Sequence, residues 1–76
     1  MSRLPQVKAG ELVKFLKHLG FEEDRQKGSH LTLVHPERPI PITVPVHTGE
    51  DIGRGLLART LKDAGSSAAE FIRWRS

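Results

Sequence analysis

The sequence contains no cysteine, so neither a disulfide nor a thiolate metal site can add to its stability. This matters because a chain of 76 residues is short. A chain of this size buries only about 60% of the surface that it exposes when unfolded. We therefore expect a single compact domain that is held together by the burial of aliphatic side chains.

Long hydrophobic runs are also missing. The longest apolar stretch, residues 40–46, is broken by prolines and is far shorter than the roughly 20 residues that cross a bilayer. Residues 1–5 lack the apolar segment of a secretory signal. Together with the absence of cysteine, these observations predict a cytoplasmic protein that does not enter a membrane.

Positive charge exceeds negative charge, with 12 lysines and arginines against 9 acidic residues and a formal net charge of +3. A basic protein favours polyanionic partners, because its side chains displace counterions from phosphates. The basic residues form no continuous block, so charge alone does not identify a nucleic-acid-binding protein.

The first part of the chain predicts a helix followed by a hairpin. Apolar residues at helical spacing indicate a helix over residues 9–19, and Gly20 follows it as a left-handed cap. The apolar residues are Leu12, Phe15, Leu16 and Leu19. Strands are expected over residues 21–26 and 31–34, with a turn at residues 27–29 between them.

A second turn, residues 35–39, leads into a third strand over residues 40–47. Apolar residues alternate along it, which predicts that one face of the strand packs on the core. These residues are Ile40, Ile42, Val44 and Val46. The intervening prolines cannot donate ladder hydrogen bonds, so we expect this strand at a sheet edge.

Two more helices are predicted in the second half of the chain. The spacing of Leu57, Leu61 and Ala64 indicates a helix over residues 53–64. Ser67 and Glu70 have the spacing of a capping box, which predicts a short helix over residues 68–74. The expected fold is a two-layer α+β arrangement in which helices cover one face of an antiparallel sheet and leave the other face open.

Histidines are the side chains best suited to acid–base chemistry near neutral pH, and three of the four border predicted strands. His30 follows a flexible turn that brings Lys27 and the Ser29 hydroxyl close to its imidazole, an arrangement that could hold a phosphate beside a proton carrier. The alternative is that His30 is only a polar strand residue. His35, at a strand end before a proline, favours a structural role. His47 could line the open face together with His30, or it could simply be solvated.

Other site chemistries find little support in the sequence. The histidine spacings are irregular and lack the companion ligands of a zinc site, so we expect no metal. Gly49, Gly53 and Gly55 are not followed by the lysine and serine of a phosphate-binding loop. Phe71 and Trp74 stand at helical spacing, which favours an apolar contact over a base-stacking platform.

Several short segments resemble the HicA toxin family in order and spacing over nearly the whole chain. They are Leu19-Gly20-Phe21, Gly28-Ser29-His30, His35-Pro36, Val44-Pro45-Val46-His47, and Gly55 with Leu57, Leu61, Lys62, Ala64 and Gly65. The resemblance implies an α-β-β-β-α fold similar to the double-stranded-RNA-binding domain, toxicity through cleavage of mRNA, and neutralisation by a HicB antitoxin. The catalytic histidine of the family corresponds to His30. The sequence departs from the family at Leu31, where a second histidine is common, and at Leu56, where threonine is common.

These inferences combine into a mechanistic hypothesis for a single HicA-like domain over residues 1–76. His30 acts as general acid or base while an RNA 2′-hydroxyl attacks the adjacent phosphate, without a metal or cofactor. Arg25, Lys27, Ser29 and His47 are the candidate RNA-binding residues. The alternatives are a non-catalytic module of the same fold that binds RNA or an antitoxin, and an inactive homologue that only titrates the antitoxin.

Overall fold

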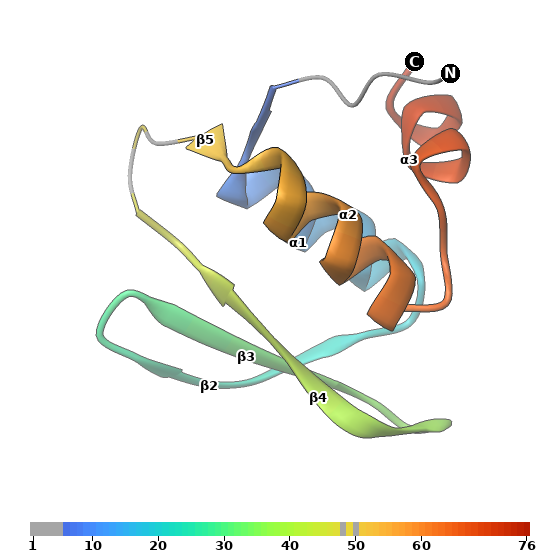
Figure 1. Ribbon diagram of the computed structural model, residues 1–76. Coiled ribbons are helices and arrows are strands. Elements are labelled where there is room, and N and C mark those ends of the chain that lie inside the picture. Colours follow the sequence, from blue (N-terminus) through green and yellow to red (C-terminus); the bar gives the residue numbers. More distant parts are fainter. Residues whose placement is uncertain (1–5, 48, 50) are drawn as a thin grey trace.

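The computed structural model describes residues 6–47, 49 and 51–76, which form two layers (Figure 1). In chain order the elements are β1 (Val7–Lys8), α1 (Ala9–His18), β2 (Glu22–Lys27), β3 (His30–His35), β4 (Arg38–Pro45), β5 (Asp51–Ile52), α2 (Arg54–Asp63) and α3 (Ala68–Arg75). Strands β2, β3 and β4 form an antiparallel sheet in that order, and α1 and α2 lie over one face of it. No element of the described part covers the other face, which confirms the two-layer α+β prediction. Residues 1–5, which the sequence predicts to lack the apolar segment of a secretory signal, lie outside the described residues.

Helix α1 forms where the apolar spacing predicted it. Its buried residues are Ala9, Leu12, Val13, Phe15 and Leu16. Leu19 is its C-cap rather than a helical residue, and Gly20 takes the left-handed conformation with φ of 104°. The N–H of Gly20 donates to the Lys17 carbonyl at 3.0 Å, and the N–H of Phe21 donates to the Leu16 carbonyl at 3.0 Å. These bonds satisfy the last carbonyls of the helix and direct the chain into β2.

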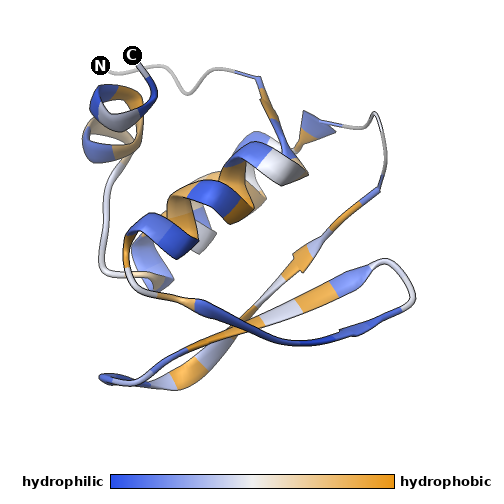
Figure 2. Ribbon diagram, turned by 180° about the vertical axis from the view of Figure 1, so that it is seen from behind, coloured by the Kyte–Doolittle hydropathy of each residue, from blue (hydrophilic) through white to orange (hydrophobic). Residues whose placement is uncertain are grey.

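The hairpin of β2 and β3 has a tighter turn than the sequence predicted. Only residues 28–29 form the turn, because Lys27 pairs with His30 and both belong to the strands. Leu31 and Leu33 of β3 point into the core, whereas β2 is exposed along its whole length. Figure 2 shows β2 as a hydrophilic strand beside the alternating pattern of β3.

Strand β4 begins two residues before the predicted start, and the expected alternation holds over only part of it. Ile42 and Val44 are buried, but Ile40 is 73% exposed, so the prediction that Ile40 faces the core is wrong. The physical reason is a shift in the pairing register of β4 opposite residues 33–35 of β3. At this shift, residues 39–41 of β4 form a bulge, and their side chains no longer alternate regularly between the two faces of the sheet.

The position of β4 at the edge of the sheet confirms the prediction made from its prolines. The N–H of Val46 donates to the Ser29 carbonyl at 2.6 Å. The backbone N–H groups of successive residues in an antiparallel strand point alternately toward one neighbouring strand and away from it. Because the N–H of Val46 points toward β3, the backbone nitrogen of Pro45 points away from β3. Proline has no N–H to donate, so at this position it removes no ladder bond.

A two-stranded ladder between β1 and β5 was not predicted from the sequence. Val7 pairs with Ile52 and Lys8 pairs with Asp51. Both apolar residues are buried, and the Lys8 ammonium lies 2.8 Å from the Asp51 carboxylate. The ladder ties the beginning of α1 to the beginning of α2, since each strand leads directly into one of these helices.

The C-terminal helix α3 forms where the capping-box spacing predicted a helix, and it packs against the core. Phe71 is fully buried, and its ring meets Phe15 of α1 edge-on with 5.1 Å between the centroids. Only half of the predicted capping box forms. The Ser67 hydroxyl accepts from the Glu70 N–H at 3.1 Å, but the Glu70 carboxylate accepts from the Ser66 hydroxyl instead of the Ser67 backbone.

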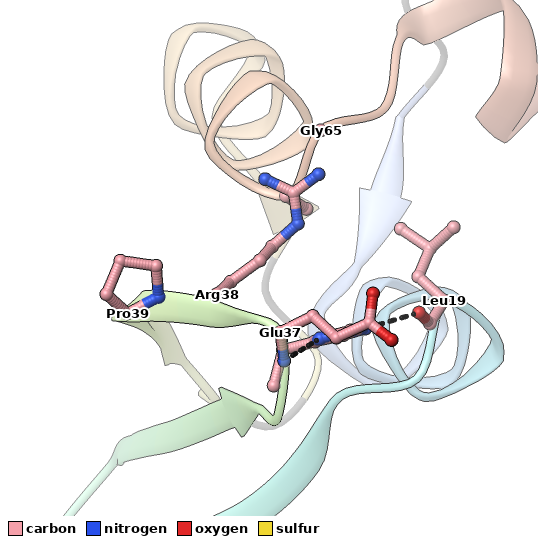
Figure 3. A pocket seen from close by; sticks show the side chains of 7 residues that line it. Leu19, Glu37, Arg38, Pro39 and Gly65 are labelled. Atoms are coloured by element: carbon pink, nitrogen blue, oxygen red, sulfur yellow. Dashed lines mark hydrogen bonds between the residues drawn. The ribbon is translucent and has the colours of Figure 1, made fainter.

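The turn between β3 and β4 fixes the sheet to the C-terminal ends of both long helices (Figure 3). Nδ1 of His35 accepts the Glu37 N–H at 3.0 Å, so Nε2 carries the ring proton and donates to the Leu19 carbonyl at 3.1 Å. The Arg38 guanidinium extends to Gly65, just after α2. A hollow of about 440 Å³ lies among these residues. Because both ring nitrogens have backbone partners, His35 holds structure together, as its position predicted.

Candidate functional site

His30 lies at the beginning of β3, the central strand, and its side chain is exposed. Leu31 and Leu33 are buried beneath the helices, and successive side chains of a strand point to opposite faces. His30 and Thr32 therefore face away from the helices. The predicted catalytic residue stands on the open face of the sheet.

Two neighbours flank His30 across the sheet. Lys27 of β2 and Pro45 of β4 are its ladder partners, and directly paired residues share a face. The alignment is Lys27, His30 and Pro45 across three strands. A cationic side chain and a rigid apolar ring thus stand on the two sides of the imidazole.

A second row runs parallel to the first on the same face. Arg25, Thr32 and Thr43 pair across the three strands, and the two threonine hydroxyl oxygens are 3.3 Å apart. The rows are two residues apart along β3, or about 7 Å. Among the residues that the structure describes, Arg25 approaches only the carboxylate of its neighbour Asp24, at 3.9 Å, and it remains 80% exposed. Lys27 forms no ion pair within residues 6–47, 49 and 51–76.

The remaining candidates lie at the same end of the sheet but outside these rows. Ser29 is half-buried in the turn, and its described hydrogen bond is made by its backbone carbonyl, to Val46. His47 is exposed and follows the end of β4. It lines a hollow of about 230 Å³ that also touches Pro45. The structure therefore brings Arg25, Lys27 and His30 onto one face and places His47 beside it.

The sequence analysis missed three residues of this face. Thr32, Thr43 and Pro45 complete the rows, and period-two alternation alone could have placed the first two opposite the core. Pro45 could not be predicted as the ladder partner of His30, because the sequence does not specify the register between β3 and β4.

Two further findings concern metals and membranes. Within the described part of the chain, no three histidine, aspartate or glutamate side chains come together in a way that could hold a metal ion. None of the helices in that part is long and apolar enough to span a bilayer.

Most of the chain matches a known protein family. The family model for the HicA toxin of bacterial toxin–antitoxin systems matches residues 9–66, from the beginning of α1 to just beyond α2. Strand β1 and helix α3 lie outside the matched range. No curated protein matches the sequence. Because the match covers most of the 76 residues and the whole helix–sheet–helix unit, the protein belongs to the HicA toxin family of toxin–antitoxin systems.

Proposed function

We propose that this HicA family member is an endoribonuclease that cleaves mRNA without a metal, acts in the cytoplasm, and is neutralised by a HicB-like antitoxin. The observation that carries the proposal is the row of Lys27, His30 and Pro45 on the open face of the sheet. It sets a residue that can transfer protons beside a cation that can contact a phosphate. The family match supports a toxin with this fold.

The proposed reaction takes its nucleophile from the substrate. His30 accepts the proton of an RNA 2′-hydroxyl while the 2′-oxygen forms a bond to the adjacent phosphorus. The bond from phosphorus to the 5′-oxygen breaks, and that oxygen takes a proton from the imidazolium or from water. The products are a 2′,3′-cyclic phosphate and a 5′-hydroxyl. DNA lacks the nucleophile and is left intact.

Proton transfer alone does not account for fast cleavage. A positioned acid or base contributes about 10² to 10⁴ in rate. Positioning and stabilisation of the phosphate must supply the rest. Lys27 stands directly across from His30 and Arg25 one row further along the same strand, so both can contact the RNA backbone. Ser29 and His47 are assigned to RNA binding at the end of the sheet.

The same face offers the most direct route to inhibition. An antitoxin that covers His30, Lys27 and Arg25 would exclude RNA, because all three residues are exposed on a face that no described element covers. Binding to the folded state would also raise the melting temperature of the toxin through mass action. A complex in which RNA still reaches His30 would contradict direct occlusion.

The proposal is tested by incubating purified protein with RNA and with DNA of the same sequence in excess EDTA. We expect RNA fragments that end in 2′,3′-cyclic phosphate and intact DNA. Loss of cleavage in EDTA that a divalent cation restores would overturn the metal-free mechanism. Intact RNA that nevertheless binds the protein would favour a non-catalytic binding module. Intact RNA that does not bind would favour an inactive homologue that titrates the antitoxin.

A further inference from the structure

A hollow of about 230 Å³ opens where the chain passes from the sheet to the helical layer, beside the end of β4 and the beginning of α2. Its lining residues are Pro45, His47, Asp51, Ile52, Gly53 and Leu56. Except for His47, none of them entered the sequence-based hypothesis as an RNA-binding residue.

The hollow adjoins the proposed site of cleavage. Pro45 lines the hollow and is also the ladder partner of His30. Neighbouring strands are about 5 Å apart, so the hollow begins one strand away from the imidazole. The base of a nucleotide next to the reacting phosphate can therefore reach the hollow without any movement of the strands.

The chemistry of the lining distinguishes a base from a phosphate. Pro45, Ile52 and Leu56 supply the apolar part of its lining, and Leu56 is a large aliphatic residue that is 39% exposed to solvent. Among the residues that the structure describes, no lysine or arginine lines the hollow, and Asp51 places a carboxylate there. Lys8 neutralises that carboxylate but does not itself line the hollow, so an anionic phosphate would find no cation among the lining residues, whereas a flat, neutral, partly apolar group fits both features.

Asp51 is held in place by its surroundings. Its Oδ1 lies 2.8 Å from the Lys8 ammonium, and Lys8 also donates to the Gly49 carbonyl at 2.8 Å. A carboxylate accepts hydrogen bonds and cannot donate them. It therefore accepts readily from the amino group of a base. Uracil has no amino group, and its single ring donor, N3–H, lies between two carbonyl oxygens that the carboxylate repels. The imidazole of His47 can stack on a base that donates to this carboxylate.

We infer that this hollow is a base-binding subsite for a nucleotide adjacent to the cleaved phosphate, and that it selects adenine, cytosine or guanine over uracil. The inference rests on the proposed ribonuclease function for its biological meaning, but the binding of the base can be measured separately. Leu56 supplies the apolar wall, and Asp51 supplies the hydrogen-bond acceptor.

The experiment measures binding to the His30→Ala protein, which should cleave its ligand about 10² to 10⁴ times more slowly than the wild-type protein. Short oligoribonucleotides that differ only in one base, which is varied at each position in turn, are titrated by fluorescence anisotropy. We expect uracil at one of these positions to weaken binding about tenfold relative to cytosine, the effect of one hydrogen bond to a charged group. Asp51→Asn should reduce this preference, because an amide can also donate to the uracil carbonyl.

Leu56→Ala tests the apolar wall, and Ile72→Ala is its matched control. Both residues are aliphatic, both lie on helices, and they are 39% and 36% exposed. We expect Leu56→Ala to weaken binding of the cytosine-containing oligomer several-fold to tenfold, and Ile72→Ala to leave it unchanged. Neither side chain is part of the buried core, so both variants should fold.

The outcomes separate the two proposals. If the wild-type protein cleaves RNA but binding does not depend on the base at any position, the subsite is wrong and the ribonuclease function stands. If base preference depends on Asp51 and Leu56 but the wild-type protein does not cleave RNA, the subsite stands and the function is wrong. Equal effects of Leu56→Ala and Ile72→Ala would also overturn the subsite.

Discussion

His35 offers a stability prediction that can be worked out from the contacts of a single side chain. Its ring accepts the Glu37 N–H, donates to the Leu19 carbonyl, and meets the Phe21 ring edge-on at 5.0 Å between centroids. Each hydrogen bond contributes about 0.5 to 1.5 kcal/mol and the ring contact about 0.5 to 1.5 kcal/mol. We therefore expect His35→Ala to lower the free energy of unfolding by about 2 to 4 kcal/mol.

The assay is urea unfolding at a pH at which histidine is neutral, followed by circular dichroism. The matched control is His18→Ala, since His18 is exposed on α1 and, within the described part of the chain, has two ring contacts and no hydrogen bond from its side chain. Its ring centroid lies 6.1 Å from that of Phe15 and 5.8 Å from that of Trp74. We expect His18→Ala to cost about 1 kcal/mol or less. His35→Asn can keep the acceptor for Glu37 and should fall between wild type and His35→Ala. A loss below about 0.5 kcal/mol for His35→Ala would refute the view that this side chain fixes the sheet to the helices.

Three further predictions concern the core, a helix end and the RNA-binding face. Phe71→Ala should destabilise the protein by about 3 to 5 kcal/mol, because the ring is fully buried, and unfolding with an unchanged midpoint would show that α3 is not part of the core. Gly65→Ala should lower the free energy of unfolding by about 1 to 2 kcal/mol, because Gly65 has φ of 75° and a side chain there would overlap the Arg38 guanidinium. Calorimetry that detects no change in stability would contradict this prediction. Lys27→Ala should weaken RNA binding and reduce the slope of log affinity against log salt by about 0.7, whereas Lys14→Ala, on α1, should leave the slope unchanged. Equal slopes for all three proteins would remove Lys27 from the RNA-binding face.

Features with a local cause could be predicted from the sequence. The apolar spacing of residues 9–19 and 53–64 located α1 and α2 to within a residue at each end, because one face of each helix is buried. Gly20 could be identified as a helix end because only glycine adopts the left-handed conformation without strain. The prolines indicated an edge strand, because they cannot donate ladder bonds.

Features that depend on distant parts of the chain could not be predicted. β1 and β5 are two residues long, too short for any periodic pattern, and they pair only because α1 and α2 bring them together. Ile40 has the residue type and spacing of a core position, but a bulge that the sequence does not encode locally leaves it in solvent.

In the candidate site, too, local features could be predicted and features that depend on distant parts of the chain could not. Lys27 and His30 flank a short turn, so their proximity followed from the sequence. The contribution of Pro45 depends on the register between β3 and β4, and the hollow joins His47 to Asp51 and Leu56 through the tertiary fold. The catalytic and RNA-binding roles of these residues stay predictions.

Single-turnover cleavage by the wild-type and His30→Ala proteins in excess EDTA measures whether His30 transfers a proton during RNA cleavage. We expect the variant to cleave about 10² to 10⁴ times more slowly. Its RNA affinity and its unfolding midpoint should change little, because the side chain is exposed and is proposed to transfer a proton, whereas Lys27 and Arg25 are proposed to contact the phosphates. Cleavage by His30→Ala at the wild-type rate would contradict proton transfer by His30 and would make His47, at the same end of the sheet, the next residue to test.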